Sequence, residues 1–344
     1  MLLRAGEAVD EQQGSDAPLP TTGWPGRDVR QRAAVDPHDG RGGIGACHRG
    51  RSLGVRSDHR DDDYAGARCP DPPDTVKETV VPSVVPTEGW GVLHLFFHVR
   101  RELLEGAQGA ARDFAGRLKA FDDRDGYQVL AFSVLGQKAD FGVMALGPDL
   151  AALDGLHTEL AGSPLGQALL PAASYLSLTE LSDYGQTEEE EVERLRREGI
   201  EPGTDAHEEQ LAAFRERMEA YARHRLYPDL PQRQVIGFYP MSKRRGGEHN
   251  WYLLDFEQRR RLMGAHAQTG RRFSDRITQL ITASTGLDDW EWGVTLLADD
   301  PKALKDVVYT MRFDEVSARY SDFGPFVTGL VCEPDELFRH LHLT

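Results

Sequence analysis

The feature that most constrains the fold is an order of strand and helix patterns that occurs twice along the chain. Short apolar runs typical of strands are separated by segments whose apolar residues recur every three or four positions, as they do in helices. The first half predicts strands at 90–99, 127–135, 140–146 and 173–180, and helices at 102–120 and 148–161. The second half predicts strands at 234–240, 250–254, 290–297 and 326–331, and helices at 256–268, 273–282 and 301–310.

This repeat predicts an α+β fold made of two duplicated ferredoxin-like units. In the first half two strands follow one another through a short turn, which indicates a sheet layer with helices on one face rather than a purely parallel sheet. Two four-stranded sheets of this kind can pack face to face and form a dimeric α+β barrel within one chain. We therefore expect a core between sheet and helices in each half.

The chain divides into four segments. Residues 1–84 are rich in Gly, Pro, Asp and Arg and have almost no apolar periodicity. We therefore expect this segment to be disordered, or to be a mis-called extension that results from a translation start assigned too early. Residues 85–185 are the predicted N-terminal ferredoxin-like half, and residues 231–344 are the C-terminal half. Between them, residues 186–230 carry Glu and Arg at spacings of three and four, which predicts an exposed helical connector.

Charge and cysteine content exclude several classes of protein. The formal net charge of -16 argues against a nucleic-acid partner, because phosphate binding relies on clustered Lys and Arg. No apolar run approaches the roughly 20 residues that span a bilayer, and the N-terminus lacks the pattern of a secretion signal. Cys47, Cys69 and Cys332 have no metal-ligand spacing, so the sequence predicts a cytoplasmic protein without a disulfide framework or a zinc site.

The first candidate site lies at the end of a predicted strand, in the segment Gly237–Arg245. Pro240 cannot donate a hydrogen bond to a sheet, so the strand must end, bulge or lie on an edge there. Tyr239 and Lys243 lie beside this irregularity. Two interpretations remain open: an ordinary strand end whose lysine stem covers apolar surface, or a pair of functional side chains.

The second candidate site lies on the helix predicted at 256–268. Leu262 and Met263 precede His266 by four and three residues, which places all three on one apolar face. An imidazole on the buried side of a helix needs a polar partner. The spacing is compatible with a hydrogen-bonded core histidine and with a metal ligand.

The third candidate site follows a turn at Gly286–Asp289 that leads into a strand of alternating large residues. Arg312, Ser317 and Arg319 occupy a turn-like stretch farther along the chain. These side chains could hold a carboxylate ligand, or the arginines could pair with Asp or Glu of the chain itself.

Taken together, these segments match a known family. The motifs are Tyr-Pro-Met-Ser-Lys, Asn-Trp-Tyr, Leu-Met-x-x-His-x-x-x-Gly-Arg, Asp-Asp-x-Glu-Trp-Gly-Val-Thr-Leu and Met-Arg-Phe-Asp-Glu-x-Ser-Ala-Arg-Tyr. In this order they closely resemble the coproheme decarboxylase family of the chlorite dismutase-like superfamily, in its Gram-positive type. The resemblance covers roughly residues 85–335 and is dense from Gln234 to Gly329.

The resemblance implies a role for individual residues. His266 falls on the proximal histidine that binds iron, and Tyr239 on the tyrosine that forms a radical and attacks a propionate. Gln279 falls on the distal glutamine above the iron, where chlorite dismutases have an arginine. The other matching positions line or bind the propionates: Arg225, Pro240, Met241, Ser242, Lys243 and Ser317.

The function implied is hydrogen peroxide-dependent oxidative decarboxylation of two propionates of Fe-coproporphyrin III (coproheme). The propionates become vinyl groups and yield haem b through a three-propionate intermediate, so that coproheme is both substrate and redox cofactor. The alternatives are a chlorite dismutase-like or peroxidase-like haem enzyme, and a haem-binding protein without catalysis. The resemblance also implies a homopentamer and a transient contact with the coproporphyrin ferrochelatase.

Overall fold

The computed structural model describes residues 81–104 and 109–344, and the predictions for residues 1–80 lie outside this part of the chain. In the described residues, no helix combines the length and the apolar character needed to cross a membrane. The Val84 main-chain nitrogen donates to Asp149 at 2.8 Å, so the described chain joins the fold several residues before the first strand.

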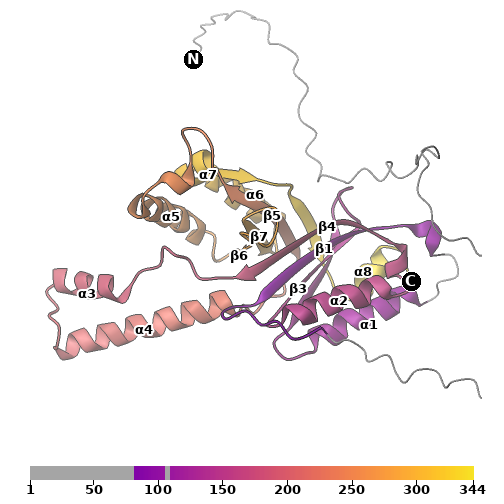
Figure 1. The fold of residues 1–344 in the computed structure, drawn as a ribbon, viewed down its shortest axis with the longest axis horizontal. Helices are drawn as coiled ribbons and strands as arrows, with labels where there is room; N and C mark the ends of the chain where they lie inside the picture. The colour runs from indigo at the N-terminus through magenta and orange to yellow at the C-terminus, as the bar shows by residue number, and fades with distance from the viewer. Residues whose placement is uncertain (1–80, 105–108) are drawn as a thin grey trace, which may run out of the picture. The chain divides into compact units, whose positions relative to one another are not determined.

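The N-terminal half is a four-stranded antiparallel sheet in the ferredoxin-like order β4-β1-β3-β2. Figure 1 shows α1, α2 and α8 together beside this half. Its elements are β1 (Gly91–Val99), η2 (Arg101–Leu103), α1 (Ala110–Asp122), β2 (Gln128–Val134), β3 (Phe141–Gly147), α2 (Leu150–Gly162), η3 (Gly166–Ala168) and β4 (Leu169–Thr179), and the last helix of the chain, α8 (Pro334–His340), packs on α1.

The C-terminal half repeats this order as β9-β5-β7-β6, and the short strand β8 lies beside the end of β5. In Figure 1, α5, α6 and α7 gather around this half. Its elements are β5 (Val235–Lys243), η4 (Trp251–Leu253), α5 (Phe256–Arg271), β6 (Ile277–Ala283), β7 (Trp292–Ala298), α6 (Pro301–Met311), α7 (Glu315–Tyr320), β8 (Ser321–Phe323) and β9 (Val327–Val331).

The two sheets join at both edges. β2 pairs with β9 and β4 pairs with β6, and the pairing of β5 with β7 completes a closed antiparallel barrel. The predicted fold of two ferredoxin-like units forming one α+β barrel is therefore confirmed. Closure gives each edge strand of one sheet a partner on the other sheet, over three residue pairs for β2 with β9 and two for β4 with β6.

Three apolar clusters hold the barrel together. The interior of the barrel contains large side chains from both halves, among them Phe96 and Phe238. Outside it, the N-terminal sheet packs on its helices through residues such as Phe114 and Leu153, and the C-terminal sheet packs on α6 through Leu304. The predicted cores between sheet and helices are present, and the barrel interior is an additional core that both sheets share.

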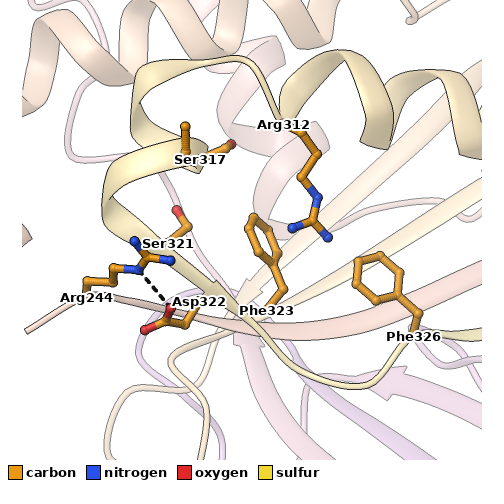
Figure 2. Close-up of a pocket in the computed structure, with 8 residues that line it drawn as sticks. Arg244, Arg312, Ser317, Ser321, Asp322, Phe323 and Phe326 are labelled. Atoms are coloured by element: carbon orange, nitrogen blue, oxygen red, sulfur yellow. Dashed lines mark hydrogen bonds and ion pairs between the residues drawn. The ribbon is translucent and has the colours of Figure 1, made fainter. Parts of the chain in front are cut away.

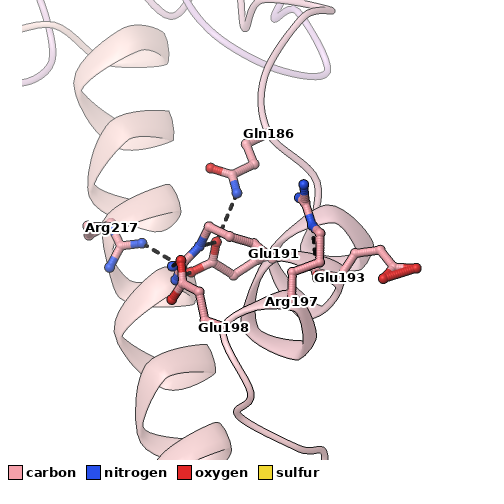
Figure 3. A network of polar contacts seen from close by, with 7 residues as sticks. Gln186, Glu191, Glu193, Arg197, Glu198 and Arg217 are labelled. Carbon is pink, nitrogen blue, oxygen red and sulfur yellow. Dashed lines mark hydrogen bonds and ion pairs between the residues drawn. The ribbon is translucent and has the colours of Figure 1, made fainter.

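The charged connector forms two helices, α3 (Glu188–Arg197) and α4 (Asp205–Leu226), which run side by side in Figure 1. Figure 3 shows the polar network between them. Glu191 of α3 is buried and accepts two hydrogen bonds of 2.8 Å from Arg194, and Arg217 of α4 lies 3.7 Å from the same carboxylate. A buried carboxylate needs such partners, so this pairing fixes α3 against α4.

Two predicted elements of the second half are wrong. Residues 277–283 form strand β6 rather than a helix, because β-branched side chains there alternate between the faces of a sheet that β7 and β4 complete. Residues 250–254 form no strand. The Asn250 side chain accepts a hydrogen bond of 3.0 Å from the Tyr252 main-chain nitrogen, and this local bond stabilises the turn η4.

Candidate functional site

The outer face of the C-terminal sheet presents the first group of predicted site residues. Phe238 of β5 and Leu280 of β6 pack inside the barrel. Since successive side chains of a strand alternate between faces, Tyr239 and Gln279 lie on the opposite, outer face. Tyr239 pairs with Val294 of β7, which pairs with Ile281 of β6, two residues from Gln279. Tyr239 and Gln279 thus lie two strands and two residues apart, about 12 Å at the usual strand spacing and rise.

Pro240 is accommodated by a change of strand partner. On one side β5 pairs with β7 through Pro240 without a break. On the other side β5 pairs with β9 up to Phe238 and with β8 from Met241 onward. Pro240 therefore lies on a local edge, one of the three arrangements that its missing N–H allows. This arrangement lets the strand continue to Lys243 and places Tyr239 and Lys243 on the same face, four residues apart.

Tyr239 is buried between aromatic rings. Its ring stacks on Phe326 with a centroid distance of 4.3 Å and lies 5.9 Å from the ring of Phe323. Burial raises the pKa of Tyr239 to about 12, although the positive charge of Arg312 opposes the shift. The phenol therefore keeps its proton throughout the physiological pH range.

Lys243 brings a buried cation to the same face. Its ammonium lies 4.6 Å from the centroid of the Trp251 ring and 3.4 Å from the Ser321 hydroxyl. Burial lowers the pKa of Lys243 to about 8, and the carboxylate of Glu291 opposes this shift. Glu291 also accepts hydrogen bonds from the Lys243 main-chain nitrogen at 2.7 Å and from the Tyr252 hydroxyl at 2.5 Å. The carboxylate thereby fixes the strand end that carries Lys243.

His266 lies on α5 and is held through one ring nitrogen. Its Nδ1 lies 3.0 Å from a carboxylate oxygen of Asp314, whose other oxygen accepts a 3.0 Å hydrogen bond from Thr269. Burial and the charge of Lys243 lower the pKa of His266, and Asp314 opposes them. A neutral imidazole whose Nδ1 is bound to a carboxylate has Nε2 available for a metal.

A cavity of about 440 Å³ lies beside Tyr239, within the size range of small-molecule sites. Figure 2 shows that its wall combines cationic, hydroxyl and aromatic side chains. Arg312 lies over the rings of Phe323 and Phe326, which are the two rings that also contact Tyr239. The lining residues are Arg244, Arg312, Ser317, Ala318, Ser321, Asp322, Phe323 and Phe326.

Of the residues to which the family resemblance assigns a role, Ser317 of α7 alone belongs to the lining of this cavity, and it is buried. His266, Lys243 and Gln279 lie outside the lining, and Tyr239 reaches it through its contacts with Phe323 and Phe326. Ser242 accepts a 3.2 Å hydrogen bond from the Glu291 main-chain nitrogen, and Met241 pairs with Phe323 of β8. Gln279 donates at 3.4 Å to the carbonyl of Gly270.

Arg225 is not part of the cavity wall. Its guanidinium donates to the carbonyls of Glu180 and Ile281 at 3.2 and 3.3 Å, at the junction of β4 and β6. Its Nε is buried and has no hydrogen-bond partner in the described structure. Arg225 therefore retains a donor for a ligand, in a place separate from Arg312.

Several residues of the site were not singled out from the sequence. Asp314 lies within the Met-Arg-Phe-Asp-Glu motif, but nothing in the spacing shows that it contacts a histidine 48 residues earlier. Arg244 and Asp322 are unremarkable charges in the sequence and meet only because β8 pairs with the end of β5. Glu291 gives no sign of burial, because charged residues usually face water.

Comparisons with known proteins agree with this architecture. The family model described as chlorite dismutase matches residues 104–332. The chain belongs to the chlorite dismutase family. A relative from Natronomonas pharaonis that is named as a heme-binding protein is 38% identical over 259 residues, which cover 73% of this chain and 40% of the relative. The chain thus spans about two fifths of the length of that relative.

Solved structures of the family show the same fold. A protein from Thermus thermophilus, described as a novel heme-binding protein, is 32% identical, with a TM-score of 0.60 and coverage of 76% of this chain and 98% of the other. A chlorite dismutase variant from Candidatus Nitrospira defluvii has a TM-score of 0.56 at 17% identity, covering 74% of this chain and 96% of that protein. At such identity the second likeness concerns the fold alone.

Proposed function

We propose that this member of the chlorite dismutase family binds coproheme and catalyses its hydrogen peroxide-dependent decarboxylation to haem b. The observation that supports this most directly is the placement of Tyr239. A buried phenol that keeps its proton contacts both aromatic rings of a cavity wall that also carries Arg312 and Ser317. This combination suits a porphyrin whose ring packs on aromatic side chains, whose carboxylates bind cationic groups and whose propionate is oxidised next to a tyrosine.

The residues present fit an iron porphyrin. In the described residues, no group of three or more His, Cys, Asp or Glu is arranged to hold a metal ion. His266 can supply one ligand only, and an iron that already has four porphyrin nitrogens needs one axial protein ligand. The carboxylate of Asp314 on Nδ1 is the partner that an iron-binding imidazole usually has.

The cationic side chains match the substrate's carboxylates. Arg312 and Lys243 lie on the Tyr239 side of the site, and Arg225 lies at the opposite edge of β6 with an unpartnered donor. Charge-assisted hydrogen bonds from these groups would fix the orientation of a tetra-anionic porphyrin. Orientation decides the reaction, because only a propionate next to Tyr239 can react with it.

Each decarboxylation converts a propionate carboxylate into a vinyl group and releases carbon dioxide, one proton and two electrons. One hydrogen peroxide takes up the two electrons, this proton and one further proton from solvent, and becomes two waters. When bound, the porphyrin iron would provide the redox chemistry that uses hydrogen peroxide as the oxidant. Tyr239 supplies the phenol that is oxidised and then removes the hydrogen atom from the β-carbon of the propionate. Arg312 and Lys243 hold carboxylates in place, and Gln279 offers a neutral amide on the same sheet face.

The test is to incubate the purified protein with coproheme and hydrogen peroxide and to follow the porphyrin by mass spectrometry. We expect stepwise loss of two formate-equivalent masses through a three-propionate species. Tyr239→Phe should abolish product formation. Tyr309→Phe is the matched control, because Tyr309 is 64% exposed and the same hydroxyl is removed. Normal conversion by Tyr239→Phe would refute the radical role.

The names of the two haem-binding relatives favour one alternative, haem binding without turnover. The same experiment separates the two, since a binding protein would change the porphyrin spectrum and leave its mass unchanged. His266→Ala should abolish the axial ligand and shift the absorbance maximum of the bound iron porphyrin. The homopentamer, the contact with coproporphyrin ferrochelatase and a cytoplasmic location stay predictions from the sequence.

A further inference from the structure

The cavity wall contains an ion pair that the proposed reaction does not use. Arg244 follows Lys243 directly, and its Nε lies 2.8 Å from a carboxylate oxygen of Asp322 on β8. Its Nη1 donates to the Arg319 carbonyl at 3.2 Å, and its main-chain nitrogen donates to the Tyr320 carbonyl at 3.0 Å. Figure 2 shows this pair beside Ser321. These contacts hold the guanidinium at the wall, and in the described structure its Nη2 has no hydrogen-bond partner.

Arg312 is a second guanidinium on the same wall, and it is held differently. Its charged group lies 4.1 Å from the centroid of the Phe323 ring and 5.7 Å from that of Phe326. Among the described residues Arg312 forms no ion pair. It enters from the end of α6, whereas Arg244 enters from the end of β5 (Figure 2). The cavity thus has one free guanidinium and one that is neutralised by Asp322.

We propose that Arg244 is a second carboxylate-binding residue of the porphyrin site, and that Asp322 occupies it until a substrate carboxylate takes its place. This inference rests on the proposed function and adds a specificity to it. The pair selects porphyrins that carry carboxylates at more positions than Arg312 alone can bind.

The exchange is physically reasonable because the ion pair is exposed. The side chains of Arg244 and Asp322 are 39% and 55% exposed, so Asp322 can return to water at little cost. The incoming carboxylate replaces it with another charge-assisted hydrogen bond. Until that happens, the negative charge of Asp322 opposes carboxylates in the cavity. A porphyrin without a carboxylate in this position cannot release Asp322 and gains nothing from Arg244.

The experiment measures equilibrium binding of two metal-free porphyrins by fluorescence. Coproporphyrin III has four carboxylates around the ring, and protoporphyrin IX has two on one edge. We expect Arg244→Gln to weaken coproporphyrin binding about tenfold, the order expected for one charge-assisted hydrogen bond, and to change protoporphyrin binding less than about twofold. Asp322→Asn should strengthen coproporphyrin binding about threefold at low salt and less at high salt.

A double variant and a matched control sharpen the test. In the Arg244→Gln background, adding Asp322→Asn should strengthen coproporphyrin binding by less than the threefold expected in wild-type protein. The reason is that Arg244, the group from which Asp322 is displaced, is absent in this double variant. Asp113→Asn is the control for net charge. Asp113 pairs with Arg117 on α1 at 2.8 Å with 44% of its side chain exposed, far from the cavity in sequence and in the other half. It should leave both affinities unchanged.

Three results would overturn the proposal. Equal losses for both porphyrins in Arg244→Gln would show that the ion pair only anchors β8 to β5. An unchanged coproporphyrin affinity in that variant would show that Arg244 touches no carboxylate. If the wild-type protein binds neither porphyrin, both the proposed function, which takes coproheme as its substrate, and this inference are refuted. If it converts coproheme and Arg244→Gln binds normally, only this inference fails.

Discussion

The two halves of the barrel have the same strand order but use the same positions for different purposes. Counted from the paired strand ends, Leu95 of β1 occupies the position that Tyr239 has on β5. By the same count Val99 corresponds to Lys243, and Val129 of β2 corresponds to Gln279 of β6 through their partners on β3 and β7. These outer-face positions carry apolar side chains in the N-terminal half and a phenol, an ammonium and an amide in the C-terminal half.

The covering helices differ in the same way. α1 buries six of its residues against the N-terminal sheet, whereas α5 buries Leu262 and Gly270 only. A sealed apolar face stabilises the barrel but has no room for a ligand. A face with a buried tyrosine, a buried lysine and a cavity is stabilised less and can bind one. The comparison assigns much of the stability to one copy of the repeat and the proposed chemistry to the other.

The largest expected effect tests the stabilising half. Phe114 is fully buried and packs edge-on against Phe141 and Phe338. Phe114→Ala should lower the free energy of unfolding by about 3–5 kcal/mol, measured by urea unfolding. Porphyrin affinity of the protein that stays folded should not change. Phe313→Ala is the control, since Phe313 is 73% exposed, and we expect less than about 0.5 kcal/mol there. A similar loss of unfolding free energy in both variants would contradict the assignment of stability to the apolar packing of the N-terminal half.

A smaller effect is expected from the carboxylate that holds His266. Asp314→Asn removes the charged partner of Nδ1, so iron porphyrin affinity should fall by about 10–100-fold. Affinity for metal-free coproporphyrin should stay the same, because in the proposed function His266 contacts only the iron. Glu315→Gln is the neighbouring control, with a side chain 45% exposed. If iron and metal-free porphyrins lose affinity alike, Asp314 shapes the site without tuning the ligand.

The smallest effect concerns the barrel interior. His94 of β1 corresponds to Phe238 of β5 in the register, is fully buried and contacts Thr295 at 3.0 Å. Burial lowers the pKa of His94 to about 3. Below about pH 6.5 the unfolded chain therefore binds a proton that the folded chain does not, and stability falls as pH decreases from about 6.5 toward 3.

Replacing His94 of β1 by phenylalanine, the residue at the matching position 238 of β5, tests the contribution of His94 to the pH dependence of stability. In His94→Phe the dependence of unfolding free energy on pH between about 7 and 5 should decrease by up to about 1.4 kcal/mol per pH unit. Urea unfolding at each pH measures it, and the slope is informative whatever the absolute stability of the variant. An unchanged slope would mean that His94 does not contribute to the pH dependence.

Predictions from the sequence were accurate where a local pattern decides the structure. Alternating apolar residues gave β5, β7 and β9, and the apolar positions three and four apart gave α2 and α5, each within a few residues of the observed ends. They failed at β6, whose Ile and Thr residues at 277, 278, 281 and 282 also fit a helical spacing. Tertiary context decided that case, since β7 pairs with the whole segment and β4 pairs with its last two residues.

For the site, the sequence supplied the residue types and the structure supplied their neighbours. That Tyr239 and Lys243 share a face follows from the period of two along a strand. That the partner of His266 is Asp314, and that Arg244 meets Asp322, follows from contacts between segments 48 and 78 residues apart.

The sequence by itself determined the repeated order of elements, the ferredoxin-like units and the motifs of the family, because periodicity and turn residues act over a few positions. Only the tertiary structure decided which edges close the barrel, which half keeps an open outer face and which charges line the cavity. The physical reason is that burial, pKa shifts and ion pairs depend on the distance between groups in space. A period of two or 3.6 residues says which face a side chain is on and leaves open what lies opposite it.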